Sequence, residues 1–239
     1  ILCGSKRSCT AITLRTSFTL DLWNIQKILK HLVQMTYSKI RKIQEKYDQY
    51  NIDSCSIPES DGWIFEMCLD YIKPKNILEI GFYKGGSAFI MMSLDEEVKL
   101  TSVDPVKNAS TDMEGVTDFS KQDKAIGKIS EEFKDRFTFI RKRSQDVRPD
   151  LLGQCFDMIF IDGDHWEEGI RNDFQLVLDL NIKYALVDDW VQPQGGPKSV
   201  PIVWNEEFAD KLKIKTVFYR EAVFQQQRIP MVLLENITL

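Results

Sequence analysis

Short apolar runs alternate with stretches of helical periodicity over most of the chain, from about residue 62 onward. The short runs are rich in residues that favour β-structure, and the longer ones carry apolar residues at a helical spacing. This alternation predicts an α/β fold, with a seven-stranded, mostly parallel sheet and helices on both faces. The predicted strands are 76–80, 99–103, 137–141, 156–161, 184–187, 215–219 and 230–234. The predicted helices are 87–94, 118–133, 167–178 and 200–212.

The N-terminal quarter of the chain has a different pattern. Residues 18–50 repeat apolar positions at helical spacing among Lys, Gln and Glu, which predicts one or two amphipathic helices. We expect a loose arm at 1–17 and a connector at 51–61. The predicted division is therefore an arm with a helical extension at 1–60 and a main domain at 61–239. The extension is interpreted as a packing or lid helix in preference to an oligomerisation arm, although it remains a candidate surface for a homo-oligomer.

Composition narrows the class of protein. The chain has 239 residues, 43% of them hydrophobic, and a net charge of −5. The negative net charge and the pI near 5.2 argue against nucleic acid as a partner. Five scattered cysteines form no metal-binding spacing and indicate reduced, cytosolic usage. No apolar run approaches the roughly 20 residues of a membrane span, so we expect a cytoplasmic protein without a membrane partner.

The first predicted strand ends in a glycine-rich turn. Glu79 and Gly81 close the strand, and Gly85, Gly86 and Ser87 open the following helix. Glycine lets a ligand approach the backbone, and a helix N-terminus offers free N–H groups to an anion. The GxxxGG spacing is not the GxGxxG dinucleotide fingerprint, and any tight turn also needs glycine.

Polar residues follow the next two strands. Asp104 lies about 20 residues beyond the first glycine, where an acid can accept hydrogen bonds from ribose hydroxyls. The alternative is a turn or helix-capping acid before Pro105. Ser144 and Gln145 follow the third strand, either as a helix cap or beside an adenine edge.

Three carboxylates are expected to converge at neighbouring strand ends. Asp162 follows one buried run, and Asp188 and Asp189 follow the next. Acids placed together repel one another unless a hard cation joins them, and oxygen ligands favour magnesium over zinc. The alternative for acids at strand ends is helix capping, and Asp164 with His165 could do only that.

Four stretches, read together, resemble a known family: LEIGFYKGGSA, RSQD, FDMIFIDGDH and VDDWVQPQGGP. In this order they look like the class I S-adenosylmethionine-dependent O-methyltransferases, in particular the metal-dependent group typified by catechol O-methyltransferase. Bacterial sugar and macrolide O-methyltransferases and cephalosporin-hydroxylase-like proteins are closer still in motif. The resemblance covers about residues 60–239 and implies a Rossmann-like fold.

The resemblance also implies roles for single residues. The sequence differs from the catechol enzyme at two of these positions. Asp189 stands where that enzyme has Asn, and His165 stands where it has its catalytic lysine. The implied metal ligands are Asp162, Asp188 and Asp189. The implied cofactor contacts are Glu79, Gly81, Gly85, Gly86 and Ser87 around the methionine, Asp104 at the ribose, and Ser144 and Gln145 beside the adenine.

These features predict an enzyme that transfers a methyl group from S-adenosylmethionine to a hydroxyl of a small molecule, such as a sugar or natural product, with magnesium. Such a transfer needs a proton acceptor, and His165 and Asp162 both remain candidates for it. The alternatives are a nicotinamide-dependent oxidoreductase and a non-catalytic scaffold that binds the cofactor. Methylation of RNA ribose is a weaker alternative, because no lysine-rich catalytic set is found at these strand ends.

Overall fold

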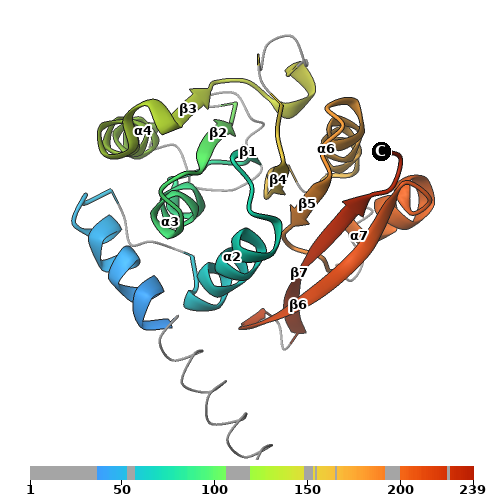
Figure 1. Ribbon diagram of the computed structural model, residues 1–239, viewed down its shortest axis with the longest axis horizontal. Helices are drawn as coiled ribbons and strands as arrows, with labels where there is room; N and C mark the ends of the chain where they lie inside the picture. Colours follow the sequence, from blue (N-terminus) through green and yellow to red (C-terminus); the bar gives the residue numbers. More distant parts are fainter. Residues whose placement is uncertain are drawn as a thin grey trace, which may run out of the picture.

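A computed structural model describes residues 37–52, 57–105, 119–147, 153, 155–164, 166–191, 200–224 and 227–239. Its centre is a seven-stranded sheet in the order β3-β2-β1-β4-β5-β7-β6 (Figure 1). β1 to β5 run parallel, and β7 pairs antiparallel with both β5 and β6. The predicted α/β sheet is confirmed. The strands are β1 Asn76–Ile80, β2 Lys99–Val103, β3 Phe137–Ile140, β4 Met158–Ile161, β5 Tyr184–Val187, β6 Leu212–Phe224 and β7 Gln227–Asn236.

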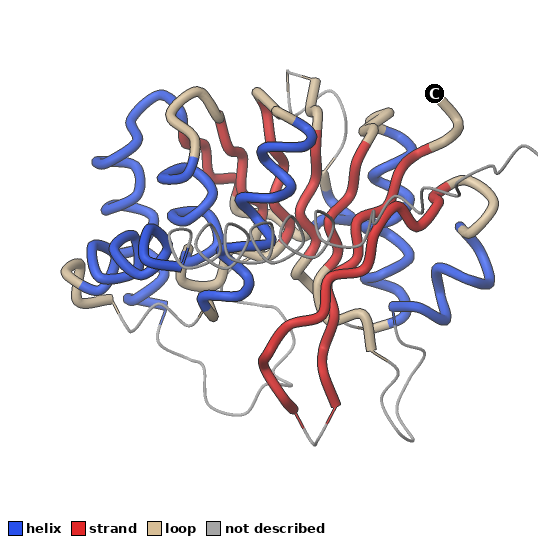
Figure 2. The backbone as a smooth tube through the Cα atoms, turned by 60° about the horizontal axis from the view of Figure 1, so that its bottom comes forward, coloured by secondary structure: helices blue, strands red, loops and turns tan. Residues whose placement is uncertain are grey.

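The last two strands are much longer than predicted. β6 and β7 form a hairpin that runs past the ends of the neighbouring strands (Figure 2). Their pairing continues through two irregularities, one between Ile214 and Thr216 and one between Tyr219 and Val223. Charged residues interrupt the apolar pattern in this segment, so periodicity alone identified only the middle of each strand.

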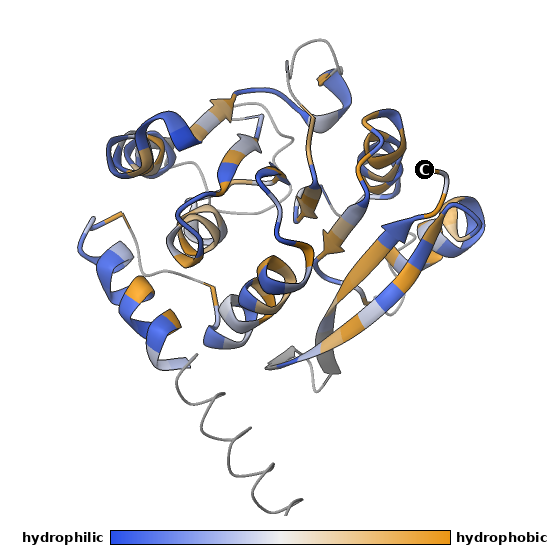
Figure 3. Cartoon of the chain, in the orientation of Figure 1, coloured by the Kyte–Doolittle hydropathy of each residue, from blue (hydrophilic) through white to orange (hydrophobic). Residues whose placement is uncertain are grey.

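Helices cover both faces of the sheet, as predicted. One apolar cluster joins α2, α3 and α4 to one face, and a second joins α6 and α7 to the other. Many positions of the strands are hydrophobic, and the helices around them carry both hydrophobic and hydrophilic positions (Figure 3). None of the described helices is long and apolar enough to cross a membrane. Their bounds are α2 Glu59–Ile72, α3 Gly86–Leu94, α4 Phe119–Phe133, α6 Glu167–Asp179 and α7 Val200–Val203.

A helix at residues 37–48 lies against the first cluster. Its Ile40 and Tyr47 side chains are buried there. This confirms a packed helix within the predicted 18–50 segment, and the part of that segment before residue 37 lies outside the described residues. The predicted connector ends early, because α2 already begins at Glu59.

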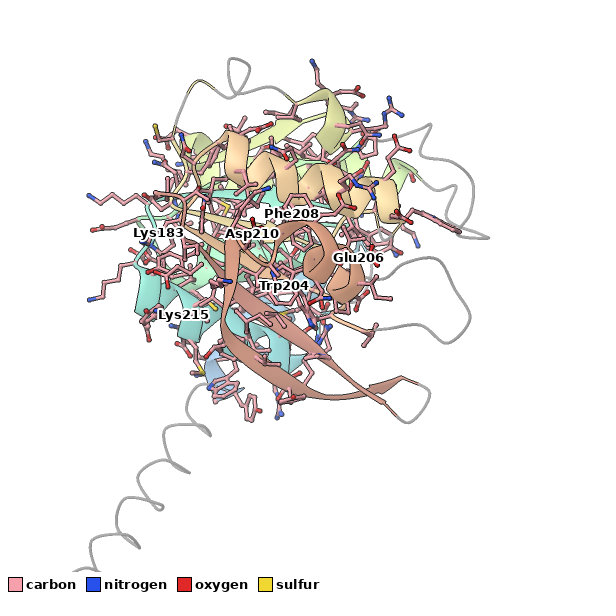
Figure 4. All side chains as sticks on the ribbon, turned by 90° about the vertical axis from the view of Figure 1, so that its right-hand side faces the viewer. Lys183, Trp204, Glu206, Phe208, Asp210 and Lys215 are labelled. Carbon is pink, nitrogen blue, oxygen red and sulfur yellow. The ribbon has the colours of Figure 1, made fainter. Side chains whose placement is uncertain are left out.

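The predicted helix at 200–212 is wrong beyond its first turns. After Val200–Val203 the chain forms a π-helical turn, Trp204–Phe208, and β6 starts at Leu212. Trp204 Nε1 donates a 2.7 Å hydrogen bond to the Leu212 carbonyl, which fixes the reversal of the chain. Trp204 and Phe208 lie on this turn beside β6 (Figure 4), and Phe208 packs against Phe174 of α6 at 5.3 Å between ring centroids.

Candidate functional site

The glycine-rich turn after β1 is held close to two neighbouring strands. Gly81 N donates to the Val103 carbonyl at 3.0 Å, which continues the pairing of β1 with β2. Gly81 has φ +92°, and a Cβ there would lie 1.9 Å from the carbonyl oxygen of Asp162. Only glycine fits this position. Gly85 has φ +78° and caps the start of α3, so the predicted turn and helix start are both found.

Asp104 is bonded to this turn. Its Oδ2 accepts hydrogen bonds from the main-chain N–H groups of Phe82 and Tyr83, both at 2.9 Å. The carboxylate lies just after β2 and therefore fixes the turn that follows the neighbouring strand β1. The contact to ribose stays a prediction.

Glu79 lies behind the turn, with no exposed surface. The hydroxyls of Ser87 and Ser102 each donate a hydrogen bond to its carboxyl group. Burial raises the pKa of Glu79 to about 7; the two serine hydrogen bonds lower the pKa, and the charges of Asp162 and Asp104 raise it further. Glu79 thus joins β1, β2 and α3 from inside the protein.

The three predicted acids do follow adjacent strands. Asp162 N donates to the Ile80 carbonyl and Asp188 N to the Ile161 carbonyl, both at 2.9 Å. The sheet pairing therefore continues one residue past β4 and β5 and brings these acids to one edge. Burial raises the pKa of Asp188 well above its ordinary value, and the nearby charge of Asp162 raises it further.

An arginine already contacts two of these acids. Arg220 of β6 donates to both oxygens of Asp188, to Asp189 Oδ1 at 3.3 Å, and to Asp61 Oδ2 of α2 at 3.0 Å. Arg220, Asp188 and Asp61 are only 7%, 8% and 2% exposed. Within the described ranges, no three acidic, cysteine or histidine side chains form a group that could hold a metal ion. This arrangement does not fit a divalent ion on Asp188 and Asp189, so the predicted metal site is not confirmed.

The remaining predicted site residues do not take part in these contacts of Arg220 with its acids, or lie outside the residues that the structure describes. Ser144 and Gln145 belong to a 3-10 turn, Ser144–Asp146, beyond the end of β3 and at the same edge of the sheet as Asp104. Asp164 Oδ1 accepts a 3.0 Å hydrogen bond from Trp166 N, a local role at the start of α6. His165 lies outside the described residues.

Three residues of the site were not predicted from the sequence. Tyr47, from the helix at 37–48, donates from its hydroxyl to the Lys84 carbonyl in the glycine turn. Asp61 was assigned to a connector, and Arg220 lies one residue past the predicted strand 215–219. A charge argument could have suggested Arg220, because buried acids need a positive partner and this arginine ends an apolar run.

Comparison with known proteins agrees with this fold. Residues 78–187 match the family model of a methyltransferase domain. Protein R132 of Acanthamoeba polyphaga mimivirus, itself uncharacterized, is 30% identical over 142 residues. The match covers 56% of this chain and 59% of the viral protein, so the chain spans less than two thirds of that relative.

Two solved O-methyltransferases share the architecture. The O-methyltransferase TomG from Streptomyces achromogenes, involved in tomaymycin synthesis and solved in complex with SAM, has a TM-score of 0.57 at 17% identity, covering 83% of this chain and 89% of TomG. An O-methyltransferase from Bacillus cereus in complex with SAH has a TM-score of 0.55 at 15% identity, covering 83% and 90% of the two chains. Residues 78–187 therefore resemble a methyltransferase domain, and the sheet has the Rossmann-like fold that these solved O-methyltransferases share.

Proposed function

We propose that this protein transfers a methyl group from S-adenosylmethionine to a hydroxyl of a small molecule. The observation that carries the proposal is the turn from Gly81 to Ser87, which Asp104 fixes through two amide hydrogen bonds. A rigid glycine turn at the C-terminal edge of a parallel sheet is where such folds take a nucleoside cofactor. The methyltransferase-domain match over 78–187 supports the same assignment.

The chain's own residues would bind the cofactor in three ways. The turn that carries Gly81, Gly85 and Gly86 would present its backbone to the cofactor, as glycine-rich turns do. The N-terminus of α3 at Gly86 offers N–H groups to the cofactor's carboxylate. Asp104, partly exposed beside the turn, is placed to interact with ribose hydroxyls.

Proton removal from the acceptor needs a base near the acids. S-adenosylmethionine supplies a methyl on a sulfonium, so the S–CH₃ bond breaks as the O–CH₃ bond forms and the hydroxyl proton passes to the protein. Asp162 and His165 are the candidate acceptors of that proton. Asp162 follows β4 next to the glycine turn, since its carbonyl lies against Gly81.

Magnesium at Asp162, Asp188 and Asp189 stays a prediction from the sequence. Arg220 contacts two of the three carboxylates, so no step of the proposed reaction is assigned to an ion. The choice of a sugar or natural product as acceptor rests on the resemblance of the motifs and is part of the proposal.

The proposal is tested by following labelled methyl from S-adenosylmethionine into a panel of sugars, phenols and other small alcohols. Transfer to at least one hydroxyl, with none of the label in added RNA, is the expected result. Binding of S-adenosylhomocysteine without transfer to any acceptor would favour a non-catalytic scaffold. Binding of NAD in its place would favour an oxidoreductase.

A further inference from the structure

Arg220 has an unusual position for an arginine. Among the described residues it is the one arginine or lysine side chain that is buried. Burial by itself lowers the pKa of Arg220, but the charges of Asp188, Asp61 and Asp189 outweigh burial and raise it above the ordinary value. The guanidinium is therefore a fixed positive charge inside the protein.

Its partners come from two other elements, α2 and the end of β5. One nitrogen, Nη1, reaches Asp61 Oδ2 at 3.0 Å and Asp188 Oδ2 at 3.3 Å. The other, Nη2, contacts Asp188 Oδ1 and lies 3.3 Å from Asp189 Oδ1. The planar fork of the guanidinium suits such two-oxygen recognition, so Arg220 holds α2, β6 and the end of β5 together.

The backbone of β6 directs this side chain inward. Tyr219 is 66% exposed, while Arg220 is buried. This is the alternation of a strand, in which successive side chains point to opposite faces, so Arg220 points to the inner face of the sheet.

We infer that Arg220 supplies the positive charge at Asp188 and Asp189 and that a divalent ion is not needed there. Arg220 is thus a positioning residue: it fixes the two carboxylates at the sheet edge, and no chelator can remove it. The consequence for catalysis rests on the proposed methyl transfer, whereas the consequence for metal binding does not.

The test is a manganese titration of the whole chain, followed by electron paramagnetic resonance and by thermal unfolding. The wild type should bind no manganese below millimolar concentration and should melt at the same temperature in EDTA and in magnesium. Arg220→Met removes the positive charge and keeps a long, unbranched side chain. It should lower the melting temperature by roughly 10 °C, because buried acids lose their partner, and added manganese should recover part of this loss.

Two further variants make the result decisive. Arg171→Met is the matched control, because Arg171 pairs with Glu167 and Glu207 at a partly exposed site and contacts neither Asp188 nor Asp189 in these pairs; it should not change the response to manganese. Arg220→Lys keeps the charge and should remain insensitive to manganese, so it decides the question if Arg220→Met does not fold.

Submillimolar binding of manganese by the wild type, lost in Asp188→Asn, would overturn the inference. Wild-type stability of Arg220→Met would also overturn it. If methyl transfer is measured, it should persist in excess EDTA. If no transfer is found, the proposed function fails while the manganese titration still decides the role of Arg220.

Discussion

The hydroxyl of Tyr47 donates a hydrogen bond to the main-chain carbonyl of Lys84, and so ties the helix at 37–48 to the glycine turn. Tyr47 is buried, and its ring packs against Phe89 of α3 at 5.4 Å between centroids. The N-terminal helix is therefore part of the support of the proposed cofactor site.

Tyr47→Phe should loosen the turn while keeping the packing of the ring. We expect a loss of about 1 kcal/mol in unfolding free energy, typical of one hydrogen bond, and weaker binding of S-adenosylhomocysteine by calorimetry. Tyr50→Phe is the control, since the Tyr50 hydroxyl donates to Glu132 at an exposed site 3.1 Å away. Equal affinities in the two variants would mean that Tyr47 does not support the turn.

Asp104→Ala should weaken binding of S-adenosylhomocysteine by roughly 10- to 100-fold, as the loss of hydrogen bonds to a charged group does. The control is Asp157→Ala. Asp157 Oδ2 also accepts two backbone N–H groups, from Lys75 and Asn76, but at the opposite end of β1. Both variants should lose some stability, and only the first should lose affinity in a calorimetric titration. A similar loss of affinity in both would show a general effect on folding.

Gly81→Ala should be strongly destabilising, by more than about 3 kcal/mol, because its Cβ would overlap the Asp162 carbonyl at 1.9 Å. Gly127→Ala provides the contrast. Gly127 lies in α4 with no atom within 4 Å of an added Cβ, so alanine there should stabilise the protein by about 0.5–1 kcal/mol. Urea unfolding of the two variants measures both effects, and a wild-type midpoint for Gly81→Ala would contradict the observed turn.

Glu79 predicts a pH dependence of stability. Its folded pKa of about 7 lies above the ordinary 4.5, so the folded protein holds a proton that the unfolded chain releases. The stabilisation from Glu79 is complete below about pH 4.5 and is lost as the pH rises through 7. Between pH 5 and 8, the wild type should therefore lose about 2–3 kcal/mol relative to Glu79→Gln. Urea unfolding without cofactor at both pH values measures this difference, and parallel pH profiles would refute the raised pKa.

The central strands could be predicted because burial on both faces leaves a continuous apolar run. β1, β2 and β5 have the predicted bounds. The helix α2 was missed because its first residues, with Pro58 and Gly62 nearby, look like a turn. A Cβ at Gly62 would lie 2.5 Å from Ile40 Cγ2. This glycine therefore allows α2 to pack closely against the helix at 37–48, a contact that the local sequence does not reveal.

The polar site was predictable only where it follows strand ends. Asp104, Asp162 and Asp188 could be placed at one edge of the sheet, because the alternation of strands and helices implies parallel strands. Arg220 could not, because it is 32 positions from Asp188 and 159 from Asp61. No local spacing encodes such a contact, because the three residues come together only when α2, β5 and β6 pack in the fold.

The most direct test of the central claim is a calorimetric titration of the wild-type chain with S-adenosylhomocysteine, beside an identical titration with NAD. The glycine turn and Asp104 predict saturable binding of S-adenosylhomocysteine at one site per chain and no heat of binding with NAD. Binding of NAD, or no binding of S-adenosylhomocysteine to a folded chain, would contradict the assignment of this turn to a methyl-donor cofactor.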